Sequence, residues 1–219
     1  MKIVFLLLLL AAWSVMTAEE ISLTDPGRLE LMNIQAEAAT HHGTKAVKLT
    51  EKGNEPEAKN LAIVKNAKFH NGTIELDVSG TPAAGASGDA RGFIGVAFRL
   101  QPDGAHYELF YIRPTNGRAD DQLRRNHAIQ YDSFPDWPWS RLRKESPGVY
   151  ESYADMLPGE WTHLRVVVRG TNASLYVGKA EQPSLIVRDL KLGDVEGGLA
   201  LWIGPGTEGY FRGLKVSSE

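Results

Sequence analysis

Hydrophobic and polar residues alternate along most of the chain in short runs, which are separated by Gly, Pro, Asn and Asp. Alternation with a period of two predicts β-strands that bury one face, whereas the 3.6-residue period of a helix is nearly absent. The clearest case is 162–169, where Leu164, Val166 and Val168 form one apolar face before a turn. The predicted strands are 28–33, 45–50, 61–64, 72–78, 93–100, 106–113, 128–131, 149–153, 162–169, 173–177, 185–188, 199–203 and 210–216.

Many short strands without long helices between them predict an all-β fold, an antiparallel two-sheet jelly-roll sandwich rather than a βαβ fold. Residues 19–219 are enough to form a single domain that buries about 70% of its unfolded surface. The chain has no cysteine, so disulfides cannot support the fold. We therefore expect one β-sandwich domain that is stabilised by core burial alone.

The first eighteen residues have the pattern of a secretory signal peptide. Lys2 precedes an apolar run over 3–12, and small residues end at Ala18. The run is about half of the ~20 residues that a membrane span needs. Residues 1–18 are thus predicted to be cleaved, leaving a secreted or periplasmic protein without a membrane anchor.

The net charge of the whole chain and that of its middle segment differ in sign. The formal net charge of the whole chain is −3, which argues against nucleic acid as a partner. Between residues 112 and 144, however, seven basic residues face four acidic ones. This segment favours an anionic ligand, and the alternative is a solvated loop whose arginines pair with nearby aspartates.

Two predicted strands precede this basic segment, and neither has a simple pattern. Strand 106–113 carries aromatic or apolar residues and charged residues on both faces, as expected where one face packs on the core and the other lines a groove. Strand 93–100 has small residues such as Gly95 and Ala97 on one face. These leave room for a ligand or allow close packing against a neighbouring element.

The stretch after strand 106–113 is long and rich in functional side-chain types. Loops of this length in compact domains are functional or disordered, and the Trp and Tyr content argues against disorder. Aromatic rings offer flat faces to sugars, and Arg forks bind carboxylates or sulfates. The predicted saccharide-binding residues are Arg113, Arg124, Arg125, Asn126, Tyr107, Tyr111, Trp137 and Trp139.

At this point the sequence resembles a known group. The segments 92–99 (GFIGVAFR), 107–114 (YELFYIRP), 161–164 (WTHL) and 213–214 resemble the laminin-G and glucanase-like jelly rolls of concanavalin A-like type. Within this group the chain is similar to secreted proteins of the 3-keto-disaccharide hydrolase-like family. The resemblance covers about residues 74–216 and implies a carbohydrate-related jelly roll. The superfamily includes glycoside hydrolases, polysaccharide lyases, lectins and adhesion modules, so the fold does not select the chemistry.

The chemistry of the glucanase branch is not expected here. Its signature, Glu-x-Asp-x-x-Glu on one strand, has its nearest approach in Glu75 and Asp77, and Gly80 stands where the second glutamate would be. A retaining mechanism with two carboxylates is therefore not carried over.

Jelly rolls that cleave acidic polysaccharides by elimination use a different set of residues, and the segment after strand 106–113 resembles them in its residue types. Such a reaction needs a cation to neutralise the uronate and a base within reach of the neighbouring proton. His127 is the predicted base, and Tyr131 or Tyr111 the acid. Glu108 and Asp121 are alternative acids or bases for hydrolysis. A structural His127 that bonds to a loop carbonyl is the competing interpretation.

No phosphate-binding loop, serine elbow or zinc-binding helix motif occurs in the sequence. We therefore expect no metal site and no required cofactor, although a structural calcium ion could bind at Asp120 and Asp121. Two functions remain. The first is an enzyme on oligo- or polysaccharides, including acidic ones, that is glycoside hydrolase-like or lyase/dehydratase-like; the alternative is a non-catalytic carbohydrate-binding or adhesion module. Clustered titratable groups favour the enzyme.

Overall fold

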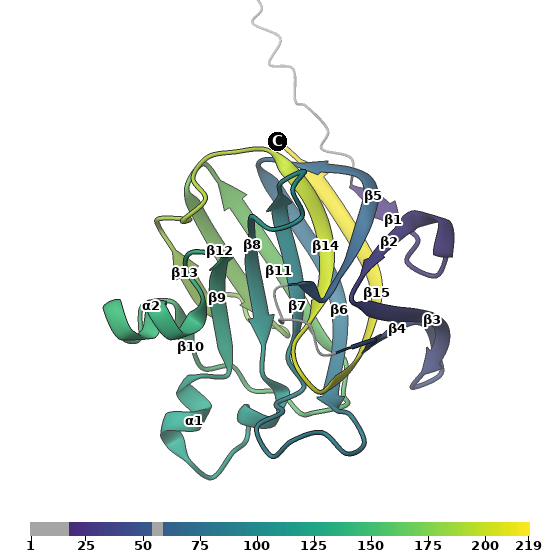
Figure 1. The fold of residues 1–219 in the computed structure, drawn as a ribbon. Helices are drawn as coiled ribbons and strands as arrows, with labels where there is room; N and C mark the ends of the chain where they lie inside the picture. Colours follow the sequence, from purple (N-terminus) through teal and green to yellow (C-terminus); the bar gives the residue numbers. More distant parts are fainter. Residues whose placement is uncertain (1–17, 54–58) are drawn as a thin grey trace, which may run out of the picture.

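The computed structural model describes residues 18–53 and 59–219. The predicted signal peptide therefore lies almost entirely outside the described residues. Within them the chain forms two antiparallel sheets that pack face to face (Figure 1). No helix of the described residues has the length and hydropathy needed to cross a membrane.

The larger sheet has eight strands among the described residues, in the order β13-β12-β11-β6-β15-β4-β3, with β1 paired to β15. Its strands are β1 (Glu19–Ile21), β3 (Ile34–His41), β4 (Thr44–Glu51), β6 (Gly72–Pro82), β11 (Thr162–Arg169), β12 (Asn172–Val177), β13 (Leu185–Val187) and β15 (Thr207–Ser218).

The second sheet has seven described strands in the order β10-β9-β8-β7-β14-β5-β2. They are β2 (Leu29–Met32), β5 (Leu61–Phe69), β7 (Ile94–Leu100), β8 (Tyr107–Ile112), β9 (Ile129–Phe134), β10 (Glu151–Ser152) and β14 (Gly197–Ile203). The helical segments are short: η1 (Pro26–Arg28), η3 (Pro114–Asn116), α1 (Gln122–Asn126) and α2 (Trp139–Glu145).

Alternating side chains fill the space between the sheets. Val96 and Phe98 of β7, Phe110 of β8, and Leu164 and Val166 of β11 belong to one buried cluster. Burial of this apolar surface is the main favourable contribution to folding in a chain without disulfides. The structure confirms the predicted all-β jelly-roll sandwich.

Strand β8 is buried on both faces. Phe110 points into the core between the sheets, whereas Tyr107, Leu109 and Tyr111 belong to a second cluster with Trp202 of β14. The mixed pattern of this strand thus reflects one face toward the core and another toward a second aromatic layer. The aromatic side of β8 continues toward the end of the sandwich at Tyr111.

Each predicted strand falls on an observed strand, although 149–153 is reduced to the two-residue β10. The sequence pattern missed β1 and β3. Strand β3 is an edge strand whose residues are mostly exposed or half-buried, so it lacks the apolar alternation that identifies a strand. The long stretch after β8 contains η3, α1 and α2, which are too short to produce a helical period.

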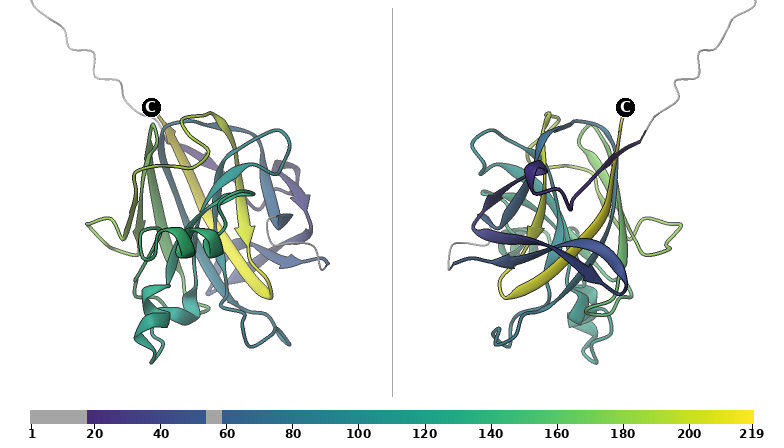
Figure 2. Two further views of the ribbon diagram at one scale, coloured as in Figure 1. Left: turned by 60° about the vertical axis from the view of Figure 1, so that its left-hand side comes forward. Right: turned by 90° about the vertical axis from the view of Figure 1, so that its right-hand side faces the viewer.

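These helical segments determine where a site can form. Helix α1 and the connections β6–β7 and β14–β15 gather at one end of the sandwich, away from the C-terminus, as Figures 1 and 2 show. The rigid sheets therefore carry several irregular segments at one end, which is the arrangement in which binding sites commonly form.

Candidate functional site

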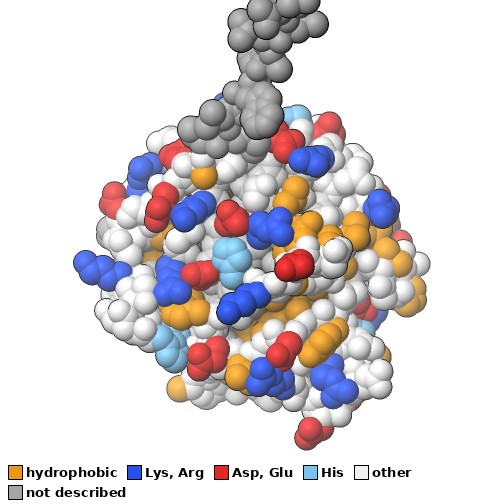
Figure 3. Space-filling model, turned by 180° about the vertical axis from the view of Figure 1, so that it is seen from behind, with side chains coloured by type: hydrophobic (Ala, Val, Ile, Leu, Met, Phe, Trp, Pro, Cys, Tyr) orange, Lys and Arg blue, Asp and Glu red, His pale blue; other side chains and the backbone are white. Residues whose placement is uncertain are grey.

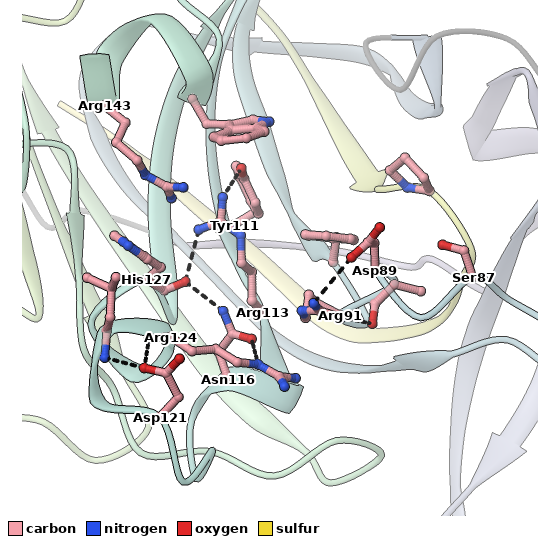
Figure 4. A pocket seen from close by; sticks show the side chains of 15 residues that line it. Ser87, Asp89, Arg91, Tyr111, Arg113, Asn116, Asp121, Arg124, His127 and Arg143 are labelled. Atoms are coloured by element: carbon pink, nitrogen blue, oxygen red, sulfur yellow. Dashed lines mark hydrogen bonds and ion pairs between the residues drawn. The ribbon is translucent and has the colours of Figure 1, made fainter. Parts of the chain in front are cut away.

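A cavity of about 690 Å³ lies at this end of the sandwich. Its lining comes from the β6–β7 connection, the end of β8, the η3–α1 segment, α2 and the β14–β15 turn. Figure 4 shows His127 and Arg143 on one side of the cavity, Asp89 and Arg91 on the other, and Arg113 between them. Its size is in the range of ordinary small-molecule sites.

Two glycines allow the β6–β7 connection to close one wall. Gly92 has a φ of +69°, and a Cβ atom there would lie 2.9 Å from the carbonyl of Gly80. Conversely, a Cβ on Gly80 would lie 2.3 Å from the carbonyl oxygen of Gly92. This contact places the neighbours of Gly92, Arg91 and Phe93, in the cavity wall. It also explains why the glucanase glutamate cannot stand at position 80.

Helix α1 carries the opposite wall. The side chain of Asp121 accepts hydrogen bonds from the backbone N–H groups of Leu123 (2.8 Å) and Arg124 (3.2 Å), so it caps the helix N-terminus. This cap fixes the first turn and with it the direction of Arg124 into the cavity wall. The carboxylate of Asp121 thus has a structural role in addition to lining the cavity.

Arg113 and Arg124 are held by neutral groups. Arg113 donates to the carbonyl oxygen of His127 (2.9 Å) and to the hydroxyl of Tyr111 (2.8 Å). Arg124 donates to Oδ1 of Asn116 (2.8 Å) and to Oγ1 of Thr115 (3.0 Å). Neither guanidinium is within ion-pair distance of a carboxylate in the described part of the chain. Both are therefore fixed in place while their charge is not neutralised.

Arg91 adds a third positive charge. Its Nη1 donates to the carbonyl oxygen of Gly88 (2.6 Å), and its Nη2 lies 3.7 Å from the fully exposed Asp89. Burial lowers the pKa of Arg91, and the nearby charges of Arg124 and Arg113 lower it further, against the opposing effect of Asp89. This mutual repulsion indicates a concentration of positive charge.

The fourth arginine, Arg143 of α2, is different because its carboxylate partner is buried and close. Its Nη2 lies 2.6 Å and its Nε 2.9 Å from Oε2 of Glu151. In total four arginines and two aspartates line the cavity, so its potential is positive even when His127 is neutral.

Aromatic side chains complete the lining. Phe93 and Tyr111 lie beside the guanidinium of Arg113, whose central carbon is 5.9 and 4.9 Å from their ring centroids. Trp139 is 37% exposed, and the guanidinium of Arg143 lies 4.8 Å from its ring. The cavity therefore combines flat apolar surfaces with fixed cations.

His127 is the titratable base of the cavity. Its Nδ1 is buried and lies 2.7 Å from Oε2 of Glu151, although the two atoms are not aligned as a regular hydrogen bond. Burial lowers the pKa of His127, Glu151 opposes this, and the positive charge of Arg143 adds to it. The lowered pKa favours the neutral imidazole, which is the form that can accept a proton.

Comparisons with known proteins identify the fold. No protein-family model matches the chain, and no curated protein matches it. Among solved structures, the carbohydrate-binding module CBM66 from Bacillus subtilis aligns with a TM-score of 0.55 at 14% identity, covering 86% of this chain and 98% of the module.

Two further structures are similar. A protein of unknown function with a galectin-like fold from Bacillus subtilis has a TM-score of 0.54 at 10% identity, covering 90% of this chain and 92% of its own. A glycosidic hydrolase has a TM-score of 0.51 at 13% identity, covering 94% and 97%. The chain folds as an antiparallel two-sheet jelly roll. At these identities the similarity establishes the fold of the jelly roll and not its activity.

The jelly roll brings six of the predicted site residues together. They line the cavity and come from β8 and the segments that follow it: Tyr111, Arg113, Asp121, Arg124, His127 and Trp139. The other predicted residues lie elsewhere, in the core, in the second aromatic layer or on the surface of α1.

Glu108 and Tyr131 form a pair in the core between the sheets. Both are fully buried, and the Tyr131 hydroxyl donates to Oε2 of Glu108 at 2.6 Å. The backbone N–H of Lys191 donates to the Tyr131 hydroxyl (2.7 Å), and that of Leu192 to Oε1 of Glu108 (2.8 Å). Burial raises the pKa of Glu108 and of Tyr131. The pair anchors a loop of the jelly roll and does not line the cavity. Of the two predicted acids, Tyr111 is therefore the one that lines the cavity together with His127.

The remaining predicted binding residues have other contacts. Tyr107 packs against Phe134 at 5.2 Å between ring centroids. Trp137 packs against the core, and the guanidinium of Arg141 lies 3.6 Å from the Trp137 ring. Arg125 donates to the carbonyl oxygen of Ala119, and Asn126 is exposed at the end of α1; neither lines the cavity.

Sequence reasoning missed several lining residues. Arg91, Phe93 and Asp89 belong to the β6–β7 connection, and Arg143 to α2. A signal existed in the run of Gly, Ala and Ser over residues 83–92, which predicts an irregular connection, but nothing in it indicates that this connection folds toward α1. Within the described residues no group of three or more His, Cys, Asp or Glu could hold a metal ion. Calcium binding at Asp120 and Asp121 stays a prediction.

Proposed function

We propose that the cavity binds a saccharide that carries carboxylate or sulfate groups. The observation that carries this proposal is the pair Arg113 and Arg124, whose guanidinium groups are fixed by neutral acceptors and make no ion pair with a described carboxylate. Fixed cations without counter-ions are suited to an anionic ligand because no internal ion pair must break when the ligand binds.

The aromatic walls support a sugar as the ligand. Trp139 and Phe93 supply flat apolar surfaces against which a sugar ring packs, and Asn116 supplies an amide for hydroxyl groups. The similarity to a structure named as a carbohydrate-binding module and to one named as a glycosidic hydrolase agrees with this ligand class. We propose that the protein meets this ligand outside the cytoplasm, as the predicted signal peptide implies.

The reaction that these residues support is elimination from a uronate. Arg113 contacts both the Tyr111 hydroxyl and the His127 carbonyl, so it fixes the two predicted proton-transfer groups around one cavity. An arginine paired with the uronate carboxylate makes the proton on the adjacent carbon more acidic, and Nε2 of His127 removes it. The electron pair forms a carbon–carbon double bond as the glycosidic oxygen leaves, and the Tyr111 hydroxyl gives that oxygen a proton.

The alternative is a non-catalytic acidic-saccharide-binding module. The observation that favours it is the burial of Tyr111, which is only 2% exposed and already accepts a hydrogen bond from Arg113. A hydroxyl in this environment can serve as a fixed contact for a bound sugar without giving up its proton.

Mass spectrometry after incubation with neutral, uronic and sulfated oligosaccharides separates these functions. Elimination yields an unsaturated fragment, and the fragment masses sum to the parent mass without added water. Hydrolysis adds one water to that sum and would contradict the elimination. Binding of acidic members without any product would support the module. Binding of neutral members only would overturn the proposed ligand class.

A further inference from the structure

Glu151 lies directly behind the cavity wall. It belongs to β10 at the edge of the seven-stranded sheet, and its side chain is only 5% exposed. It does not line the cavity, and no sequence motif distinguishes it. A carboxylate at this depth is stable only with charged or hydrogen-bonding partners, so its contacts indicate what it does.

One oxygen of Glu151 contacts two cavity residues. Oε2 lies 2.7 Å from Nδ1 of His127 and 2.6 Å from Nη2 of Arg143. These residues belong to different segments of the chain: His127 follows α1, and Arg143 is in α2. A single buried carboxylate therefore holds the base of the cavity and one of its cations on the same side, where Figure 4 shows them.

The short distance from Nδ1 to the carboxylate determines the tautomer of the imidazole. An unprotonated Nδ1 would place two electron-rich atoms, Nδ1 and a carboxylate oxygen, 2.7 Å apart with no proton between them, and the two would repel each other. The carboxylate therefore favours a neutral His127 that carries its proton on Nδ1. Its lone pair is then on Nε2, the nitrogen on the opposite side of the ring from the buried Nδ1.

We propose that Glu151 is a positioning residue that keeps His127 protonated on Nδ1 with Nε2 free to accept a proton, and that holds Arg143 beside it in the cavity wall. This inference rests on the proposed function for its role in catalysis. The same arrangement orients the imidazole in many sites where a carboxylate stands behind a histidine.

Charges from every neighbouring element act on His127. Glu151 of β10 favours the protonated imidazole, whereas Arg143 of α2 and Arg113 after β8 disfavour it. Helix α1 contributes Arg124 and Asp121 to the same cavity. Glu151 and Arg143 thus act on the proton affinity of His127 in opposite directions, and this opposition provides the test.

The experiment is a pH titration of the ligand-free, ¹⁵N-labelled mature protein by NMR, with the imidazole nitrogens observed directly and His127 assigned by its loss in His127→Asn. In the wild type we expect the neutral tautomer with its proton on Nδ1. Glu151→Gln should shift the His127 titration to lower pH, because it removes a negative charge. Arg143→Met should shift it to higher pH, because it removes a positive charge.

His163, which lies 2.8 Å from Asp77 on the eight-stranded sheet, is the internal control, and its signals should be the same in both variants. A neutral tautomer protonated on Nε2, or a His127 titration that neither variant moves, would overturn the inference. Circular dichroism checks that each variant is folded. If Glu151→Gln does not fold, the direction of the His127 shift in Arg143→Met still tests the inference. Because no saccharide is present, this result is independent of whether the proposed ligand binds.

If the saccharide panel identifies a substrate, a second measurement follows. Glu151→Gln should lower kcat about tenfold or more and should change KM less than Arg143→Met does, because Glu151 acts on the proton transfer through His127 and on substrate contact only indirectly, through Arg143. Arg143→Met should raise KM, because Arg143 lines the cavity in which the proposed substrate binds. An unchanged kcat in Glu151→Gln would overturn the catalytic part of the inference.

Discussion

The cavity and the exposed face of the eight-stranded sheet contain the same types of side chain in different arrangements. On the sheet, Nε of Arg212 lies 2.9 Å from Asp77, His163 lies 2.8 Å from the same carboxylate, and Lys48 lies 3.0 Å from Glu208. The rear view toward this sheet shows positive and negative side chains interspersed (Figure 3). Its charges neutralise one another.

In the cavity, by contrast, Arg113 and Arg124 are held by carbonyl, hydroxyl and amide oxygens. Fixing an arginine with neutral acceptors requires buried polar partners at defined positions, whereas a surface ion pair requires only a nearby carboxylate. The charge of the partners, and not the number of arginines, therefore distinguishes the proposed binding site from the solvated surface of the sheet.

The largest difference between the two regions should appear when their histidines are changed. His127→Asn should lower the turnover of an acidic oligosaccharide about 10²- to 10⁴-fold, because it removes the proposed general base. His163→Asn, on the sheet, should leave turnover unchanged. Steady-state kinetics with both variants tests this, and equal losses in the two would remove the distinction between the regions.

The next effect concerns the arginines. Arg124→Gln should weaken binding of an acidic oligosaccharide about tenfold or more, because a charge-assisted hydrogen bond contributes about 1.5–3 kcal/mol. The matched control is Arg165→Gln on the sheet, where Arg165 stacks on Tyr176 at 3.6 Å. Titration calorimetry measures both affinities, and thermal unfolding shows whether each variant is folded. A similar loss from Arg165→Gln would contradict the localised site.

A variant of Glu108 tests whether the buried Glu108–Tyr131 pair stabilises the fold or takes part in ligand binding. Burial raises the pKa of Glu108 above its ordinary value of 4.5, so the folded protein binds this proton more tightly than the unfolded chain. The resulting stabilisation is complete below pH 4.5 and is lost as pH rises through the folded pKa.

The Glu108→Gln variant has no ionisable group at this position. Its stability relative to the wild type should therefore increase from pH 4 toward neutral pH, as a larger free energy of unfolding. Urea unfolding at a series of pH values measures this trend. Saccharide affinity should not change in this variant, since Glu108 does not line the cavity. A pH-independent difference in stability, or a lost affinity, would place Glu108 in a different role.

The smallest effect is expected on the sheet. Arg212→Gln breaks a part-exposed ion pair with Asp77 and should lower the free energy of unfolding by no more than about 1 kcal/mol. Saccharide affinity should stay at the wild-type value. A drop of affinity in this variant would indicate a second saccharide site on the sheet face.

The sequence was most informative where a side chain's direction follows from strand periodicity. Leu164, Val166 and Val168 predict their own burial, and the two-sided pattern of 106–113 predicts a strand with a core face and a site face. Tyr111 and Arg113, which were predicted from this segment, line the cavity. Edge strand β3 was missed because its exposed residues need no apolar alternation.

The sequence was least informative where segments meet that are far apart in the chain. Tyr131 has the residue type of a proton donor, but the alternation of β9 turns it into the core, where it meets Glu108. Arg91 reaches the cavity only because Gly80 and Gly92 approach closely. Gly95, whose small size allowed either ligand space or packing, is packed: a Cβ there would lie 2.1 Å from the carbonyl oxygen of Phe110.

The most direct test of the central claim compares the affinities of two ligands that share one sugar backbone and differ in charge: an oligogalacturonate and the same oligomer with its carboxylates methyl-esterified. Titration of the mature protein with each at low ionic strength measures the effect of replacing the carboxylates by neutral esters. We expect the acid to bind at least tenfold more tightly than the ester, with a difference that shrinks in Arg124→Gln and at high salt. Equal affinities, or tighter binding of the ester, would contradict a cavity built for an anionic saccharide.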